Sequence, residues 1–201
     1  MILKNKIATL SVGLLLTTAS YGQATKTVID YLRVAGPISF EKDSYNLAWT
    51  SHPADNYYKQ EYLAKGDTLE KFKRLILIDV LVGKTKIKDL VATKIAELNK
   101  IKASNPIVQY QTFEKGDEIM LDFLLSENTP DGKLVSTIER NVYRYKNITG
   151  KNGQKAVLLF GVSNRAYGND IDDFLLNLKD NRHDLLNAVG AFDLPEIVIA
   201  K

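Results

Sequence analysis

Four charged residues stand where the surrounding sequence is apolar. Asp79 interrupts the longest apolar run after the N-terminal segment, and Asp122 lies within a second apolar stretch. Burying an unpaired carboxylate costs several kcal/mol, so each acid must reach a partner or face water. Arg140 and Arg144, on one later strand, are the candidate partners. The four residues indicate either a polar cleft holding an acid with an altered pKa, or cross-strand ion pairs on a solvated sheet face, and the second interpretation is favoured.

The densest group of amphipathic side chains falls between residues 45 and 62. Exposed rings can stack on sugars or hold a peptide, so this group supplies the candidate ligand-binding residues. They are Trp49, His52, Tyr57, Tyr58 and Tyr62. The competing interpretation, which is favoured, places Tyr45 and Trp49 in the core of a hairpin and leaves the other tyrosines to cover a sheet edge.

The sequence offers few groups for catalysis. It contains no cysteine and two histidines, and it lacks the G-x-S-x-G, H-E-x-x-H, P-loop and G-x-G-x-x-G patterns. His183 falls within an expected helix, which leaves His52, with an acid such as Glu61, as the base of a conceivable hydrolase. We therefore expect no catalytic residue, no metal site and no cofactor, and keep the hydrolase as an alternative.

Hydrophobic periodicity predicts the strands that position these residues. Alternating apolar residues predict a hairpin from 38–40 and 45–49, and a short β-branched run predicts a buried central strand at 75–82. Residues 57–63 fit either a strand or a single helical turn. Four more strands are expected, arranged as two hairpins, at 107–113, 118–125, 135–145 and 156–162.

Apolar residues three and four apart predict two amphipathic helices, 86–104 and 169–189. Consecutive hairpins pair in antiparallel fashion, and each helix needs a sheet face to cover. The sequence thus predicts the α+β class, with a single antiparallel sheet of about six to seven strands and both helices packed on it. Residues 25–201 are expected to form one domain, since a chain of this size buries roughly 70% of its unfolded surface.

Residues 1–24 are typical of a secretory signal peptide. Lys4 and Lys6 form a positive segment, residues 7–16 are mainly apolar, and small residues follow, with cleavage expected after Gly22 or Ala24. The apolar run is shorter than the roughly 20 residues that span a bilayer. The mature protein is therefore expected to be exported, either periplasmic or extracellular.

The composition limits the partners. Without cysteine there is neither a disulfide nor a lipoprotein anchor, and no later segment is apolar for long enough to form a transmembrane span. Removing Lys4 and Lys6 from the 27 basic residues leaves 25 against 24 acidic ones, a net charge of +1. This balance argues against a nucleic-acid partner. We expect a protein or glycan partner of unknown identity.

The element order resembles that of a known family. The opening Gly36-Pro37-Ile38-Ser39-Phe40, followed by Leu47-Ala48-Trp49, is similar to the entry hairpin of PsbP-like α/β/α domains, and the elements from Leu75 to Val189 follow the rest of that topology. The resemblance implies an accessory or assembly role at a membrane surface and assigns no functional residue. The C-terminal end of the expected signal peptide, Ser20-Tyr21-Gly22-Gln23, resembles that of uncharacterised exported proteins of Bacteroidetes-type bacteria.

Together these observations predict an exported, soluble, non-catalytic binding or accessory protein. Two alternatives remain open. One is a periplasmic hydrolase that uses His52 with a nearby carboxylate. The other is a carbohydrate-binding module that uses Trp49, Tyr57 and Tyr58.

Overall fold

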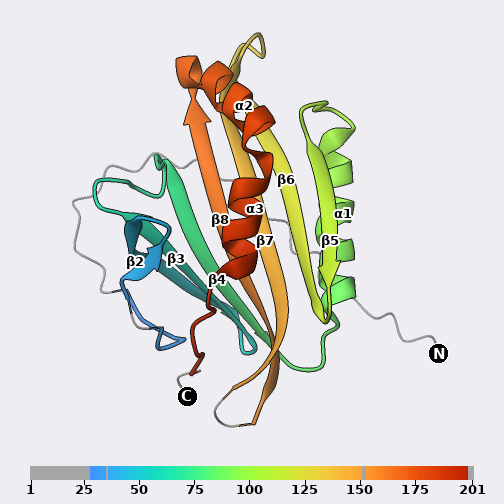
Figure 1. Ribbon diagram of the computed structural model, residues 1–201. Coiled ribbons are helices and arrows are strands. Elements are labelled where there is room, and N and C mark those ends of the chain that lie inside the picture. The colour runs from blue at the N-terminus through green and yellow to red at the C-terminus, as the bar shows by residue number, and fades with distance from the viewer. Residues whose placement is uncertain (1–27, 35, 151–152, 199–201) are drawn as a thin grey trace, which may run out of the picture.

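The computed structural model describes residues 28–34, 36–150 and 153–198, so the expected signal peptide lies outside the described residues. Eight strands form one antiparallel sheet in the order β1-β2-β3-β4-β8-β7-β6-β5 (Figure 1). The strands are β1 (Ile38–Phe40), β2 (Asp43–Ala54), β3 (Tyr57–Ala64), β4 (Arg74–Val82), β5 (Gln109–Lys115), β6 (Glu118–Asn128), β7 (Val135–Thr149) and β8 (Lys155–Tyr167).

The sheet consists of two four-stranded meanders. Strands β1 to β4 pair in chain order, and so do β5 to β8, because short turns link consecutive strands. The meanders join where β4 pairs with β8, in a register that sets Leu77 opposite Gly161. Strand β4 is buried along most of its length, as its continuous apolar sequence predicts for a central strand.

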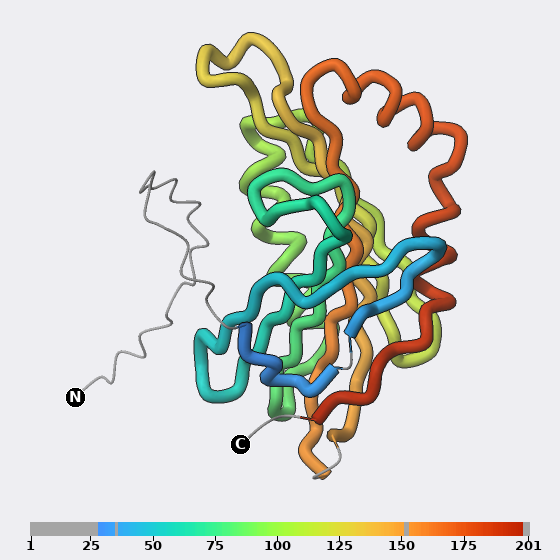
Figure 2. Tube along the Cα trace, turned by 90° about the vertical axis from the view of Figure 1, so that its left-hand side faces the viewer, coloured from blue at the N-terminus to red at the C-terminus, as the bar shows by residue number. Residues whose placement is uncertain are grey.

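Helices cover both faces of the sheet (Figure 2). Helix α1 (Ile87–Lys102) connects β4 to β5 and packs Ile87, Val91 and Leu98 against β5, β6 and β7. On the opposite face, a 3₁₀ turn (Gly168–Asp170) leads into α2 (Ile171–Asp180) and α3 (Arg182–Ala191), and α3 packs on β7 and β8. We refer to the two sides of the sheet as the α1 face and the α3 face.

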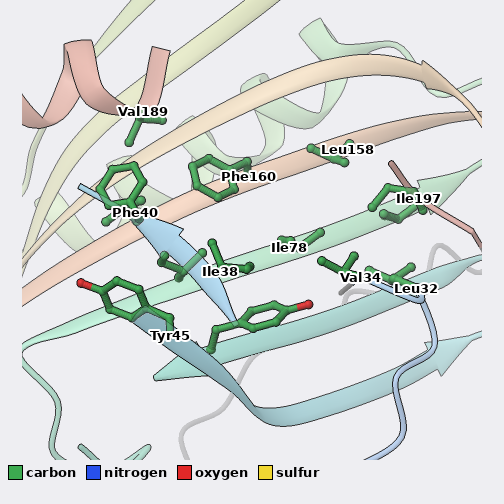
Figure 3. Close-up of a cluster of buried hydrophobic side chains, with 14 of the residues drawn as sticks. Leu32, Val34, Ile38, Phe40, Tyr45, Ile78, Leu158, Phe160, Val189 and Ile197 are labelled. Carbon is green, nitrogen blue, oxygen red and sulfur yellow. The ribbon is translucent and has the colours of Figure 1, made fainter. Parts of the chain in front are cut away.

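The α3 face carries the larger core. Figure 3 shows Phe40 of β1 beside Phe160 of β8 and Val189 of α3. The ring of Phe192 stacks on Phe160 at 4.4 Å between centroids, and Phe40 lies 5.7 Å from Phe192. The β1–β2 hairpin and the segment after α3 therefore meet over the sheet, which accounts for the alternating apolar residues of the 38–49 hairpin.

Both ends of the described chain are tied to this core. The backbone N–H of Leu32 donates to the side-chain Oε1 of Gln60 at 2.9 Å, and the Gln60 amide donates to the Tyr62 hydroxyl at 2.6 Å. The N–H of Val198 donates to the Leu32 carbonyl at 3.0 Å. Gln60 is fully buried, and these bonds satisfy its polar atoms.

The α+β class and the single antiparallel sheet are confirmed, but two details of the sequence prediction were wrong. The sheet has eight strands rather than six to seven, because residues 57–64 form a full strand instead of a helical turn. The described residues contain three α-helices rather than two, because the expected 169–189 helix breaks at Asn181. Its φ and ψ of −115° and 31° lie outside the helical region, and asparagine competes with the helix for backbone hydrogen bonds.

Candidate functional site

The structure divides the predicted aromatic cluster between the two faces. The rings of His52 and Tyr58 stack at 4.2 Å between centroids on the α3 face, where Tyr58 is 7% exposed and Tyr62 is fully buried. Trp49 and Tyr57 belong to the α1 face, because Trp49 pairs with Glu61 and Tyr57 with Leu81. The three rings of the carbohydrate-binding alternative therefore do not form one platform, since Tyr58 lies on the other side of the sheet from Trp49 and Tyr57.

The same division separates the acid and the base of the hydrolase alternative. His52 projects from β2 onto the α3 face, where its ring contacts Tyr31 and Tyr58. Glu61 projects from β3 onto the α1 face, opposite Leu77. A dyad needs its two groups within hydrogen-bond reach or one water apart, and the sheet stands between these two side chains.

Five residues of three neighbouring strands meet on the α1 face. We call them the β3 patch: Trp49 of β2, Tyr57, Lys59 and Glu61 of β3, and Asp79 of β4. A β-bulge at Ala48 shifts the register of β2, since Leu47 pairs with Tyr62 and Trp49 pairs with Glu61. Such a bulge re-aims the side chain that follows it, and here it places Trp49 beside Glu61.

Asp79 is the most unusual residue of the patch. It is 7% exposed, and the Tyr57 hydroxyl donates to its Oδ2 at 2.6 Å. The Lys59 Nζ lies 3.8 Å from Oδ2, too far for a hydrogen bond. Oδ1 has no partner, and among the described residues it is the one fully buried side-chain polar atom in this state. Burial raises the pKa of the Asp79 carboxyl, while the nearby lysine and the tyrosine hydroxyl oppose the shift.

Glu61 lies diagonally across from Asp79 on the neighbouring strand. Partial burial raises the pKa of its carboxyl, the charge of Lys59 lowers it, and the charge of Asp79 raises it further. Within the described part of the chain, Glu61 forms neither a hydrogen bond nor an ion pair. The patch thus combines two carboxyl groups whose pKa values are raised with a partly exposed ammonium group, that of Lys59.

The patch lies on a part of the α1 face that no described helix covers. Helix α1 packs on β5, β6 and β7, and its Lys94 reaches near enough to lower the pKa of Asp79. On the other side, Phe72 of the β3–β4 loop packs against Leu63 and Leu75. Trp49, Tyr57, Lys59 and Glu61 remain partly exposed between these two covers.

The floor beside the patch depends on Gly161. A Cβ atom at this position would stand 2.8 Å from Leu77 Cγ and 2.9 Å from Tyr143 Cδ1. Because glycine has no side chain, these two side chains lie directly over the β8 backbone. Burial strongly raises the pKa of the Tyr143 hydroxyl, which keeps it neutral. The floor is therefore a tight, uncharged surface next to Glu61 and Asp79.

The other predicted polar residues form ion pairs on the α3 face. Arg140 binds both oxygens of Asp122, at 3.0 and 2.9 Å, and both residues are buried. Arg144 binds Glu118 instead, with Nε 2.6 Å from Oε2, and this pairing lowers the pKa of the Glu118 carboxyl. The structure thus brings Arg140 and Asp122 together, gives Arg144 a different acid, and sets Asp79 apart on the opposite face.

Sequence reasoning missed the part that Lys59 plays and the proximity of Glu61 to Asp79. The signal was available in the alternation of Tyr57, Lys59 and Glu61, which reads as one face of a strand once 57–64 is recognised as a strand. No group of three or more histidine, aspartate and glutamate side chains in the described residues could hold a metal ion. None of the helices in the described ranges is long and apolar enough to cross a membrane.

Comparison with known proteins places the chain in a family. A protein-family model matches residues 32–194, which include every described strand and helix, so the chain belongs to this uncharacterised family. A search of curated proteins finds no match.

Proposed function

We propose that this family member is an exported, non-catalytic binding protein whose ligand is a glycan held at the β3 patch. One observation carries the proposal: the unpartnered Oδ1 of Asp79 lies under a partly exposed group of side chains on the uncovered part of the α1 face. Folded proteins seldom leave a buried polar atom unsatisfied, because the loss costs about 1–3 kcal/mol. A hydroxyl-rich ligand supplies the missing donor once the Lys59 side chain, 3.8 Å from Oδ2, moves aside and opens Oδ1 to it.

The composition of the patch suits a sugar. An indole ring offers a flat apolar surface to a pyranose ring, and Trp49 lies directly beside the unpaired carboxyl of Glu61. Glu61 and Asp79 can accept hydrogen bonds from sugar hydroxyls. Lys59, which stands 3.8 Å from Asp79 without bonding to it, can swing aside and bind a ring oxygen or an acidic substituent.

The same geometry argues against glycoside hydrolysis. Two catalytic carboxyl groups must flank the scissile bond, so both must be accessible to it. Asp79 is nine-tenths buried and its Oδ2 is held by the Tyr57 hydroxyl, so it can accept one hydrogen bond from a ligand but cannot face a scissile bond, whereas Glu61 is partly exposed. The β3 patch can therefore bind a sugar chain without cleaving it. A binding role also agrees with the accessory function that the resemblance to PsbP-like domains implies.

The single tryptophan of the sequence makes the proposal testable. Residues 25–201 are titrated with cellohexaose, chitohexaose and tri-galacturonic acid while the fluorescence of Trp49 is recorded. We expect a saturable change with at least one of the three. Calorimetry should show that Trp49→Ala weakens this binding by 10-fold or more, because buried aromatic contacts dominate such interfaces.

His52→Ala is the matched control, because His52 lies three residues away on the same strand and projects from the opposite face. It should leave the affinity within about twofold. Absence of a response to all three oligosaccharides, or equal losses in the two variants, would refute glycan binding at the patch. Release of shorter sugars during incubation would refute the non-catalytic part.

Export is tested separately. The full chain is expressed in a Gram-negative host, the cells are fractionated, and the N-terminus of the exported protein is sequenced. We expect it to begin at Gln23 or Thr25, because cleavage is proposed after Gly22 or Ala24. Replacing Lys4 and Lys6 with glutamate should trap the precursor in the cytoplasm. An unprocessed wild-type chain in the cytoplasm would overturn the proposed location.

A further inference from the structure

A groove of about 500 Å³ separates α2 from the β5–β6 edge of the sheet. It lies on the α3 face, away from the β3 patch. Leu175 and Leu178 of α2 form one wall, and Leu124 of β6 forms part of the other. Arg140 and Asp122 lie at its floor. We call this space the α2 groove, and its volume is within the range of about 300–1,000 Å³ that is typical of small-molecule sites.

The groove exists because the helical layer contacts the sheet at its two ends and stands off in between. Ile171 is buried at the start of α2, and Leu185 and Val189 are buried in α3. Between them Leu175 keeps 38% of its surface exposed, although it lies on the apolar stripe of α2. The part of the stripe at Leu175 is thus left partly uncovered and is available for a ligand.

Hydrogen bonds hold this arrangement in place. The buried Arg140 guanidinium donates to the backbone carbonyl of Arg182 at 2.6 Å while it binds Asp122. The Arg182 guanidinium in turn donates to Gln111 Oε1 on the edge strand at 2.6 Å. The buried Arg140 thus fixes the junction of α2 and α3 to β7, so the groove does not depend on a mobile loop, while the exposed bond of Arg182 to Gln111 can be exchanged for a ligand.

The charges around the groove are unbalanced. Asp122 neutralises Arg140, but within the described residues neither Lys179 nor Arg182 forms an ion pair. Both line the groove. Asp180 lies between them in sequence and pairs with neither. A mainly apolar groove therefore carries two uncompensated cations at one end, which favours an anionic group there.

We propose that the α2 groove binds an amphiphile with one aliphatic chain and a carboxylate head, of the size of a medium-chain fatty acid. The chain lies between Leu124 and the leucines of α2, and the carboxylate replaces Gln111 at Arg182 and contacts Lys179. An extended peptide fits less well, because its backbone polar groups on the α2 side would meet aliphatic side chains and lose their hydrogen bonds.

The test is calorimetry of residues 25–201 with sodium decanoate below its micelle concentration. We expect saturable binding with a stoichiometry near one. Decanol and decyltrimethylammonium should bind at least 10-fold more weakly, since the charge-assisted hydrogen bonds of a carboxylate to Arg182 and Lys179 are stronger than those of a neutral hydroxyl, and a cationic head is repelled there. Lys179→Gln with Arg182→Gln should weaken decanoate binding by a similar factor and leave the weak binding of decanol unchanged.

Adjacent leucines give a matched pair of variants. Leu175→Gln places an amide in the groove and should weaken decanoate binding at least 10-fold, whereas Leu176→Gln, at a 63% exposed position that does not line the groove, should leave it unchanged. Both positions are exposed, so both variants should fold, and their Tm values check this. Absence of decanoate binding, equal effects of the two variants, or stronger binding of an acidic apolar peptide than of decanoate would overturn the proposal. Glycan binding through Trp49 is measured on the other face and is independent of either result.

Discussion

Asp79 and Asp122 occupy equivalent positions on opposite faces of one sheet, with very different surroundings. Each lies in the middle of a strand, and each is 7% exposed. Both oxygens of Asp122 bind the guanidinium of Arg140, which also holds the carbonyl of Arg182. One oxygen of Asp79 accepts a hydrogen bond from Tyr57, and the other has no partner.

The comparison shows that burial alone does not identify a functional acid. Asp122 is fully bonded to groups of its own fold, so its role in stability explains its presence. Asp79 is buried to the same degree and stays incompletely bonded, which destabilises the fold when the carboxyl is charged. The presence of such an incompletely bonded acid on the uncovered part of the α1 face is what makes the β3 patch the candidate site.

The largest change in stability should come from breaking the ion pair of Arg140 with Asp122. Arg140→Met leaves the Asp122 carboxylate buried without a countercharge and should lower the free energy of unfolding by about 3–5 kcal/mol. Urea unfolding measures it. The double variant Asp122→Leu with Arg140→Met should recover most of the loss, because no unpaired charge remains. A loss below 1 kcal/mol in the single variant would mean that the Asp122 carboxylate does not need Arg140 as its countercharge.

The next largest change in stability is expected at Gly161, in the floor beside the β3 patch. Gly161→Ala forces a Cβ to within 2.8 Å of Leu77 and should destabilise the protein by about 1–3 kcal/mol. Gly190→Ala is the control, because its Cβ would meet the Met120 methyl group at an ordinary 3.4 Å within a helix. This change should stabilise by about 0.5–1 kcal/mol. If both substitutions have the same sign, the close packing over Gly161 is not limiting.

Asp79→Asn tests the incomplete bonding directly. Because the folded pKa of Asp79 is raised, the wild-type fold is most favoured by this group below the ordinary aspartate pKa, and that contribution is lost as the pH rises through the folded pKa. The variant lacks this titration. At pH 7 we expect it to be more stable than the wild type by on the order of 1 kcal/mol, with the difference vanishing towards pH 3. Urea unfolding of the variant and the wild type between pH 3 and pH 7 measures this difference. A variant that is less stable than the wild type at pH 7 would contradict the expectation.

Lys59→Met should give the smallest effect. Its ammonium group is part-exposed and 3.8 Å from Asp79, so its loss should change stability by less than about 1 kcal/mol. The same substitution removes a charge that lowers the pKa of both Asp79 and Glu61. The folded pKa of each acid should therefore rise, and the loss of stability with increasing pH should extend to a higher pH in the variant than in the wild type. Parallel pH profiles for this variant and the wild type would show that Lys59 does not act on either carboxyl.

Most of the fold was predictable because it follows from local periodicity. The continuous apolar run predicts strand β4, and the apolar stripe predicts helix α1. Short turns between consecutive strands predict antiparallel pairing. The break at Asn181 was not predictable in this way, since the apolar spacing continues in register from α2 into α3. The joining of β4 to β8 is also set by contacts between distant residues, which local patterns do not encode.

Less of the candidate site could be predicted. The sequence singled out Asp79, Trp49 and Tyr57, but it grouped them with partners that lie on the other face. The face of each side chain in β2 depends on a bulge at Ala48, and one shifted residue reverses everything that follows it. The sequence did name Arg140 as a candidate partner of Asp122, and the two residues lie at buried positions of the paired strands β6 and β7.

The joining of the two meanders has a consequence for how the chain reaches its native state. Strand β4 pairs with β8 about eighty residues later, so the central seam of the sheet forms after almost the whole chain is available. Contacts of such long sequence separation slow folding, because closure of the intervening loop must come first. For a protein that we propose to be exported, such a delay is useful, because slow closure of the seam favours a precursor that is still unfolded when it reaches a translocation channel.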